Sequence, residues 1–218
     1  MQLPAKIISW LFLPFLTPIY GLWITMFIPV EELTVESNSL YLLPPEIKRV
    51  ILGVFIIFAV LAPAISYYSL FRRKIISTVE MDDKSERNAP LLIMFAYCMV
   101  MYTLFWYKDP QHLLPSYVSS LPLTGALVAL LFTFVNRWTK ISLHAGGVGI
   151  LVGYLVAFHS SHILTPVQPV IVAVLLSGII LSSRYILAKH TLFQLNLGWC
   201  LASAISFVVN YFYPFIQL

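Results

Sequence analysis

The sequence predicts an all-α membrane protein, a bundle of six or seven transmembrane helices. Of its 218 residues, 60% are hydrophobic and only 10% are charged, and the mean hydropathy is +0.88. A soluble domain carries roughly 25% charged residues, because it must cover its surface with groups that water solvates. Apolar stretches of about 20 residues, long enough to cross a bilayer, recur along the chain. We therefore expect a single integral membrane domain over residues 1–218.

Seven apolar stretches are candidate membrane spans. They are residues 7–29, 50–71, 90–107, 116–136, 144–159, 167–183 and 193–214. Pro14 and Pro18 predict a kink or an irregular start in the first span, because proline cannot continue the helical hydrogen bonds. The fifth stretch is short and carries four glycines, which predict close packing against neighbouring helices. The count becomes six if one stretch is re-entrant.

The formal charge of +4 does not indicate a nucleic-acid partner, because the basic residues lie between apolar spans and form no separate basic domain. One predicted side of the membrane holds ten lysines and arginines, and the opposite side holds three. The ten are those of Lys6, the 72–89 loop, Arg137, Lys140, Arg184 and Lys189. The positive-inside rule therefore favours a cytoplasmic location for the first side. The bias falls to six against three if four of these cations bind a ligand instead.

Three polar clusters interrupt this apolar pattern, at Lys84–Pro90, Lys140–Gly147 and Ser183–Gln194. Ionisable residues at helix ends and inside spans are costly in a membrane protein, so they often mark functional sites. Two predicted spans separate each cluster from the next. Because an even number of crossings returns the chain to the same side, we expect all three clusters on one membrane face.

The residue types in these clusters suit a phosphate group. Four cations are candidate ligands: Lys84, Arg87, Lys140 and Arg184. Arginine gives planar bidentate contacts and lysine a point charge, and Gly146 and Gly147 open a helix whose N–H groups suit an anion. His144 and His190 offer a nucleophile and a general acid. With no cluster of carboxylates to hold a metal, we expect metal-independent phosphoryl transfer and no cofactor.

Four of these residues also have a purely structural explanation. Lys84 and Arg87 fit interfacial anchors, Arg184 fits a side chain that extends to the headgroups, and His144 fits a packing residue bonded across the bundle. The functional hypothesis depends on the joint pattern and not on any one residue.

The third cluster, Ser183-Arg184-x5-His190-x3-Gln194, resembles the Ser-Arg-x5-His-x3-Asp signature of the type 2 phosphatidic acid phosphatase superfamily. Ser142-Leu-His144 resembles the core of that family's Pro-Ser-Gly-His signature. The first cluster, from Lys84 to Pro90, is a looser relative of Lys-x6-Arg-Pro. The resemblance covers about residues 80–200, in the same order of motifs, and indicates a divergent bacterial member.

The resemblance implies a membrane phosphatase that hydrolyses a lipid phosphate or diphosphate without a metal. By this likeness His190 is the nucleophile that forms a phospho-histidine, and His144 is the general acid. Arg184 binds the phosphoryl oxygens. Lys84 and Arg87 supply the cations of the first signature, while Ser142 and Gly146 add hydrogen bonds. The family implies a bacterial inner membrane and often a periplasmic site, whereas the charge count favours the cytoplasmic face, so the face stays open.

The sequence also departs from the family pattern. Gln194 replaces the aspartate that orients and charges the nucleophilic histidine, Leu143 replaces a glycine, and Ala89 stands where an arginine precedes the proline. Two alternatives therefore remain. One is a catalytically degenerate member that binds a lipid or serves as a subunit of a membrane complex. The other is a small anion-transporter component, although the chain lacks the internal repeat typical of secondary transporters.

Overall fold

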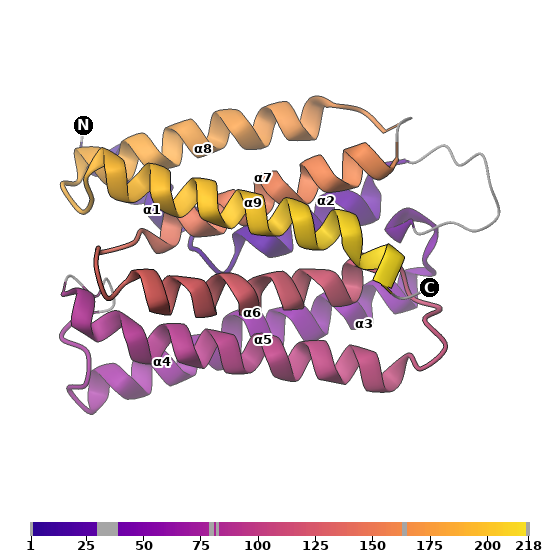
Figure 1. Ribbon diagram of the computed structural model, residues 1–218, viewed down its shortest axis with the longest axis horizontal. Helices are drawn as coiled ribbons and strands as arrows, with labels where there is room; N and C mark the ends of the chain where they lie inside the picture. The colour runs from indigo at the N-terminus through magenta and orange to yellow at the C-terminus, as the bar shows by residue number, and fades with distance from the viewer. Residues whose placement is uncertain (1, 30–38, 79–80, 82, 163–164, 217–218) are drawn as a thin grey trace.

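A computed structural model describes the chain except for residues 1, 30–38, 79–80, 82, 163–164 and 217–218 (Figure 1). Its described part is helical and contains no strand. Six helices there are long and apolar enough to cross a membrane. They are α3 (Pro45–Phe55) continuing through the π-helical η2 (Ile56–Leu61) into α4 (Ala62–Arg72), then α5 (Asn88–Lys108), α6 (Tyr117–Val135), α7 (Leu143–Ser161), α8 (Gln168–Ile186) and α9 (Leu192–Ile216). The prediction of an all-α integral membrane bundle is confirmed.

The first candidate span consists of two short helices, α1 (Gln2–Leu11) and α2 (Thr17–Phe27). The break contains Pro14, which lacks the N–H that a continuous helix needs. The Pro14 carbonyl lies in the break and accepts a hydrogen bond from Thr17 Oγ1 at 3.0 Å. Each helix is roughly 15 Å long and too short to cross a bilayer by itself. The predicted irregularity is therefore a full interruption, and the described residues form six long helices and one broken one.

Helix α7 is the centre of the bundle. Of its most apolar stretch 72% is buried, against at most 50% in any other long helix. A Cβ atom added at Gly149 would lie 2.7 Å from the Trp199 carbonyl oxygen of α9, and one at Gly147 would lie 2.7 Å from the Pro14 carbonyl oxygen. The glycines thus let two other backbones touch α7, and the predicted close packing is confirmed. The helix has 19 residues, so it is not a short span.

Buried polar side chains add specific contacts in the membrane interior. Asn210 of α9 accepts a hydrogen bond from Ser120 at 2.7 Å and donates one to Thr124 at 3.1 Å, both on α6. Ser206 of α9 donates to the Ile150 carbonyl of α7 at 2.8 Å. Such bonds hold transmembrane helices in one register, because lipid provides no alternative partner.

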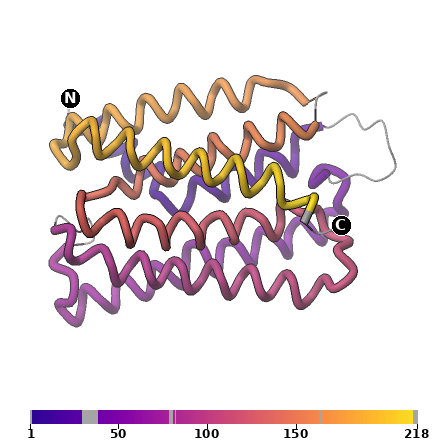
Figure 2. The backbone as a smooth tube through the Cα atoms, viewed as in Figure 1, coloured from indigo at the N-terminus to yellow at the C-terminus, as the bar shows by residue number. Residues whose placement is uncertain are grey.

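The alternating direction of the helices brings three connections to one end of the bundle. The α4–α5, α6–α7 and α8–α9 connections lie at the left in Figures 1 and 2, together with the N-terminus. The α5–α6 and α7–α8 connections and the end of α9 lie at the opposite end. All three polar clusters are therefore at the same end, as the even number of crossings requires.

We predict that Gly153→Leu disrupts the bundle. A Cβ at this position would overlap the Ser203 carbonyl oxygen, which is part of the α9 backbone and cannot move independently of the helix. Overpacking costs about 1–3 kcal/mol where side chains can shift, and backbone is less compliant. The thermal unfolding temperature in detergent should fall sharply. Gly53→Leu is the matched control, since no atom lies within 4 Å of its added Cβ, and an equal loss in both variants would contradict the packing explanation.

Candidate functional site

The α6–α7 connection organises the polar end of the bundle. Asn136, which ends α6, donates from Nδ2 to the Lys84 carbonyl at 2.7 Å and to Asn88 Oδ1 at 3.1 Å. The Lys84 ammonium donates in turn to the Arg137 carbonyl at 3.2 Å. The first polar cluster is therefore held directly against the segment that leads into the second.

Arg87 is buried at the end of the short 3-10 helix η3 (Lys84–Arg87), with only 3% of its surface exposed. Its Nε donates to the Met81 carbonyl at 3.0 Å, and its Nη1 donates to the Ile141 carbonyl. A guanidinium has five N–H donors in a rigid plane, so these two bonds fix its orientation. The cation is thereby placed at the entrance to α7.

Arg184 in the last turn of α8 and His190 in the connection that follows are 4% and 7% exposed. The Lys189 N–H donates to the Arg184 carbonyl at 3.2 Å, which satisfies a free carbonyl at the helix end. Ala188 adopts a φ of 52°, a left-handed conformation that costs a residue with a side chain roughly 1 kcal/mol. This turn reverses the chain between α8 and α9, and His190 is buried within this connection.

Gln194 holds His190 through a capping box at the start of α9. The Thr191 hydroxyl accepts from the Gln194 N–H at 3.3 Å, and Gln194 Oε1 accepts from the Thr191 N–H at 3.2 Å. The same Oε1 lies 3.3 Å from His190 Nδ1. Because a backbone N–H can only donate, the atom facing it is the amide oxygen, and His190 Nδ1 must carry the hydrogen. The lone pair of the ring is then on Nε2, the nitrogen available as a nucleophile.

Cations from all three polar clusters act on His190. Burial and, to a smaller degree, the charges of Arg87, Arg184 and Lys140 together lower the pKa of this imidazole to about 3. His190 is therefore neutral at pH 7, with an unprotonated Nε2. The three polar clusters meet around this ring, although they are far apart in the sequence.

His144 lies in the first turn of α7, and its Nε2 is 3.2 Å from the Ser9 carbonyl oxygen of α1. A carbonyl only accepts, so Nε2 carries the hydrogen and Nδ1 is the nitrogen that can gain or lose a proton. The charges of Arg184 and Arg87 act on this ring, as does His190. His144 thus belongs to the same electrostatic cluster as His190.

The remaining candidate residues are placed less centrally. Ser142 is fully buried and caps α7, accepting from the Ala145 N–H at 3.4 Å. The Gly146 N–H donates within the helix to the Ser142 carbonyl at 3.0 Å, and its Cα faces the Phe132 ring. Lys84 is exposed at the rim. The structure thus brings together six of the candidate residues: Arg87, Lys140, His144, Arg184, His190 and Gln194. Gly146 instead packs against Phe132, and the Lys84 ammonium bonds the Arg137 carbonyl. Phosphate binding by Ser142, Gly146 and Lys84 stays a prediction.

Four contributors to this end of the molecule were missed by sequence reasoning. Thr191 was detectable, because Thr-x-x-Gln before an apolar run is the capping-box pattern. Asn136 and Thr139 had weaker signals, as polar residues at the end of an apolar span; Gln194 Nε2 donates to Thr139 Oγ1 at 3.5 Å. Ser9 had no signal, because it acts through its backbone carbonyl.

Among the described residues, no three histidine, cysteine, aspartate or glutamate side chains gather as a metal site requires. Comparison of the chain with protein-family models, with curated proteins and with solved structures gives no match. The phosphatase resemblance accordingly rests on the motifs themselves, and the function drawn from it is a proposal.

We predict that acid destabilises the fold in part through His190. An unfolded histidine takes up a proton near pH 6.5, whereas the folded one does so only at about 3. The unfolded state therefore binds more protons between these values, and stability falls as the pH falls through that window. The unfolding temperature should drop less from pH 7 to pH 4.5 in His190→Gln than in the unmodified protein.

The control for this measurement is His112→Gln, in the exposed α5–α6 connection. It should reproduce the pH dependence of the unmodified protein. A pH dependence in His190→Gln that equals that of the unmodified protein would show that His190 does not titrate in this way.

Proposed function

We propose that the protein is a membrane lipid phosphatase that uses His190 as a nucleophile. The observation that carries this proposal is a neutral imidazole whose Nε2 lone pair lies within the field of three cations, Arg87, Lys140 and Arg184. A phosphate dianion is attracted to such a cluster, while the nucleophile stays unprotonated. The match of the third cluster to the Ser-Arg-x5-His signature supports the same chemistry.

In the first step, the Nε2 lone pair of His190 attacks the phosphorus and the bond from phosphorus to the lipid oxygen breaks. The bound phosphate dianion favours a second proton on the His144 ring, at Nδ1. The leaving oxygen takes this proton, and the lipid departs as an alcohol or as a monophosphate. Arg184 and Arg87 stabilise the negative charge on the equatorial phosphoryl oxygens. Gln194 holds the Nδ1–H of His190 and keeps the ring in position.

In the second step, water attacks the phospho-histidine. His144 Nδ1, now unprotonated, takes a proton from the water as the P–N bond breaks. Inorganic phosphate leaves, His190 regains its lone pair, and His144 regains its proton. The two histidines thus complete the cycle with water as the sole co-substrate, and we propose a bacterial inner membrane as its setting.

A second candidate function is a degenerate family member that binds a lipid phosphate without turnover. The observation in its favour is that the Gln194 side chain has a structural task, since its oxygen caps α9 through the Thr191 N–H. An amide orients the His190 ring, but it does not stabilise an imidazolium as a carboxylate does.

We predict that the purified protein releases phosphate from phosphatidate or an isoprenyl diphosphate and continues to do so in EDTA. His190→Ala removes the nucleophile and should lower the rate by at least about 10⁴-fold, in line with the loss of a covalent catalyst. Phosphate release is measured in detergent micelles, with His159→Ala at the opposite end of α7 as the control. Activity that survives His190→Ala would refute the mechanism.

Gln194→Glu distinguishes an active site from a degenerate one. Glutamate is close in shape to glutamine and keeps the capping box, so the fold should be retained. The added carboxylate favours the protonated imidazole. We expect the acidic limb of the pH–rate profile to move to higher pH, with a change in kcat of less than about tenfold. A rise from no measurable activity to clear turnover would instead support the degenerate member.

A further inference from the structure

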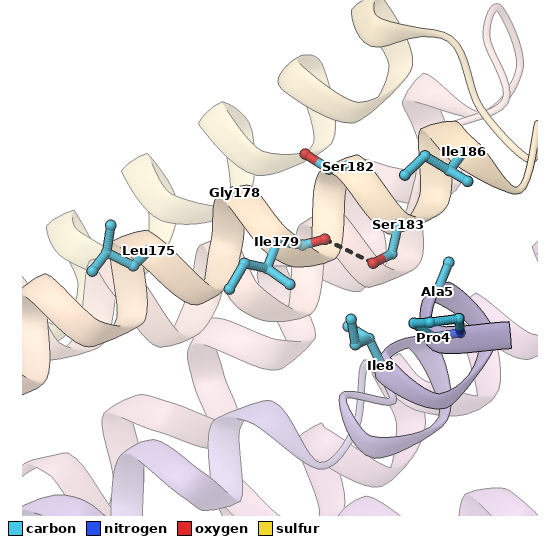
Figure 3. A pocket seen from close by; sticks show the side chains of 9 residues that line it. All are labelled: Pro4, Ala5, Ile8, Leu175, Gly178, Ile179, Ser182, Ser183 and Ile186. Carbon is cyan, nitrogen blue, oxygen red and sulfur yellow. Dashed lines mark hydrogen bonds between the residues drawn. The ribbon is translucent and has the colours of Figure 1, made fainter. Parts of the chain in front are cut away.

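An apolar groove runs between α1 and α8 at the polar end of the bundle (Figure 3). Its volume is about 490 Å³, and its walls are Pro4, Ala5 and Ile8 of α1 together with the face of α8 from Leu175 to Ile186. We call it the α1–α8 groove. Its α8 wall is exposed at Leu175 (63%) and Ile179 (48%), so the groove opens sideways from the bundle. Because α8 is a membrane-spanning helix, this opening faces the hydrocarbon of the bilayer.

Both walls of the groove lead to the candidate site. The α8 wall includes Ser183, whose hydroxyl donates a hydrogen bond to the Ile179 carbonyl at 2.8 Å (Figure 3). The next residue along the chain is Arg184. The α1 wall passes Ala5, and one turn later Ser9 holds the His144 ring through its carbonyl. A molecule with its polar end at Arg184 and His144 therefore has the apolar α1–α8 groove directly beside it.

The length of the groove matches one leaflet. Its α8 wall covers eleven steps of about 1.5 Å, or roughly 17 Å, and half of the hydrocarbon core is about 15 Å. An acyl chain of a phospholipid spans one leaflet, so its length matches that of the groove. A second groove of about 720 Å³ lies against the first half of α8, between it, α2 and α7.

We propose that the α1–α8 groove binds one acyl chain of the lipid phosphate whose head group lies at Arg184, His144 and His190. This inference rests on the proposed function for the position of the head group. It adds the class of substrate, a phospholipid with long acyl chains, and the route by which it enters, sideways from the membrane between α1 and α8.

Gly178 is the position at which to test the groove. It lines the groove, and no atom lies within 4 Å of the Cβ that a substitution would add, so a large side chain enters the groove without displacing the bundle. Gly53 on α3 has equally open surroundings and lies outside the groove. Gly178→Phe and Gly53→Phe are therefore a matched pair.

The first measurement is kcat/KM for phosphatidate with sixteen-carbon chains and with four-carbon chains. Gly178→Phe should lower the ratio of long-chain to short-chain activity about tenfold, the loss that follows when roughly two methylene groups no longer fit. Gly53→Phe should keep the ratio of the unmodified protein. An unchanged ratio in Gly178→Phe overturns the proposal, as does a larger effect on an isoprenyl phosphate than on the long-chain phosphatidate.

The second measurement does not depend on turnover. A phosphatidate with a photoreactive diazirine in one acyl chain is irradiated with the protein in phosphatidylcholine vesicles, and the labelled peptides are mapped by mass spectrometry. We expect labels on α1 and on α8 between Leu175 and Ile186, reduced in Gly178→Phe. Labelling there without phosphate release would retain the groove and refute the phosphatase. Phosphate release with labels elsewhere would refute the groove alone.

Discussion

The contact of α7 with the backbones around it is the constraint on which the rest of the structure depends. Lipid is as apolar as the side chains it surrounds, so helices in a membrane associate through close packing and hydrogen bonds rather than through the hydrophobic effect. Gly147, Gly149 and Gly153 let α7 touch the N-terminal break and α9. The first turn of α7 is thereby enclosed between α1 and α9, and His144 is held where the other two polar clusters arrive.

The candidate site combines a cluster of cations with a neutral histidine. Burial and the neighbouring cations both keep His190 neutral, as its proposed role as a nucleophile requires. Gln194 performs two tasks with one oxygen, since it caps α9 and fixes the His190 tautomer. An amide at this position therefore orients the ring without adding a negative charge.

The membrane surroundings extend the chemistry beyond the cluster itself. Arg184 ends α8, and the groove beside the same helix opens toward the bilayer. A polar head group and an apolar chain can then be bound by consecutive turns of one helix. This arrangement connects the proposed phosphate site to a substrate that stays in the membrane throughout the reaction.

The sequence by itself determined the membrane class and the common end of the three polar clusters. It predicted seven spans, of which six are long helices in the described part of the chain and the first is broken into α1 and α2. The thickness of the hydrocarbon core sets the length of each span, and the number of crossings, even or odd, sets the side of each loop. It also singled out His144, Arg184 and His190 as candidate site residues, because their spacing is a local pattern, and their role stays a prediction. Only the tertiary structure decided that Gly146 packs on Phe132, that Asn136 anchors the Lys84 segment and that the Ser9 carbonyl holds His144. These contacts join residues between 14 and 135 positions apart. Such contacts depend on how helices rotate and approach one another, which no local pattern encodes.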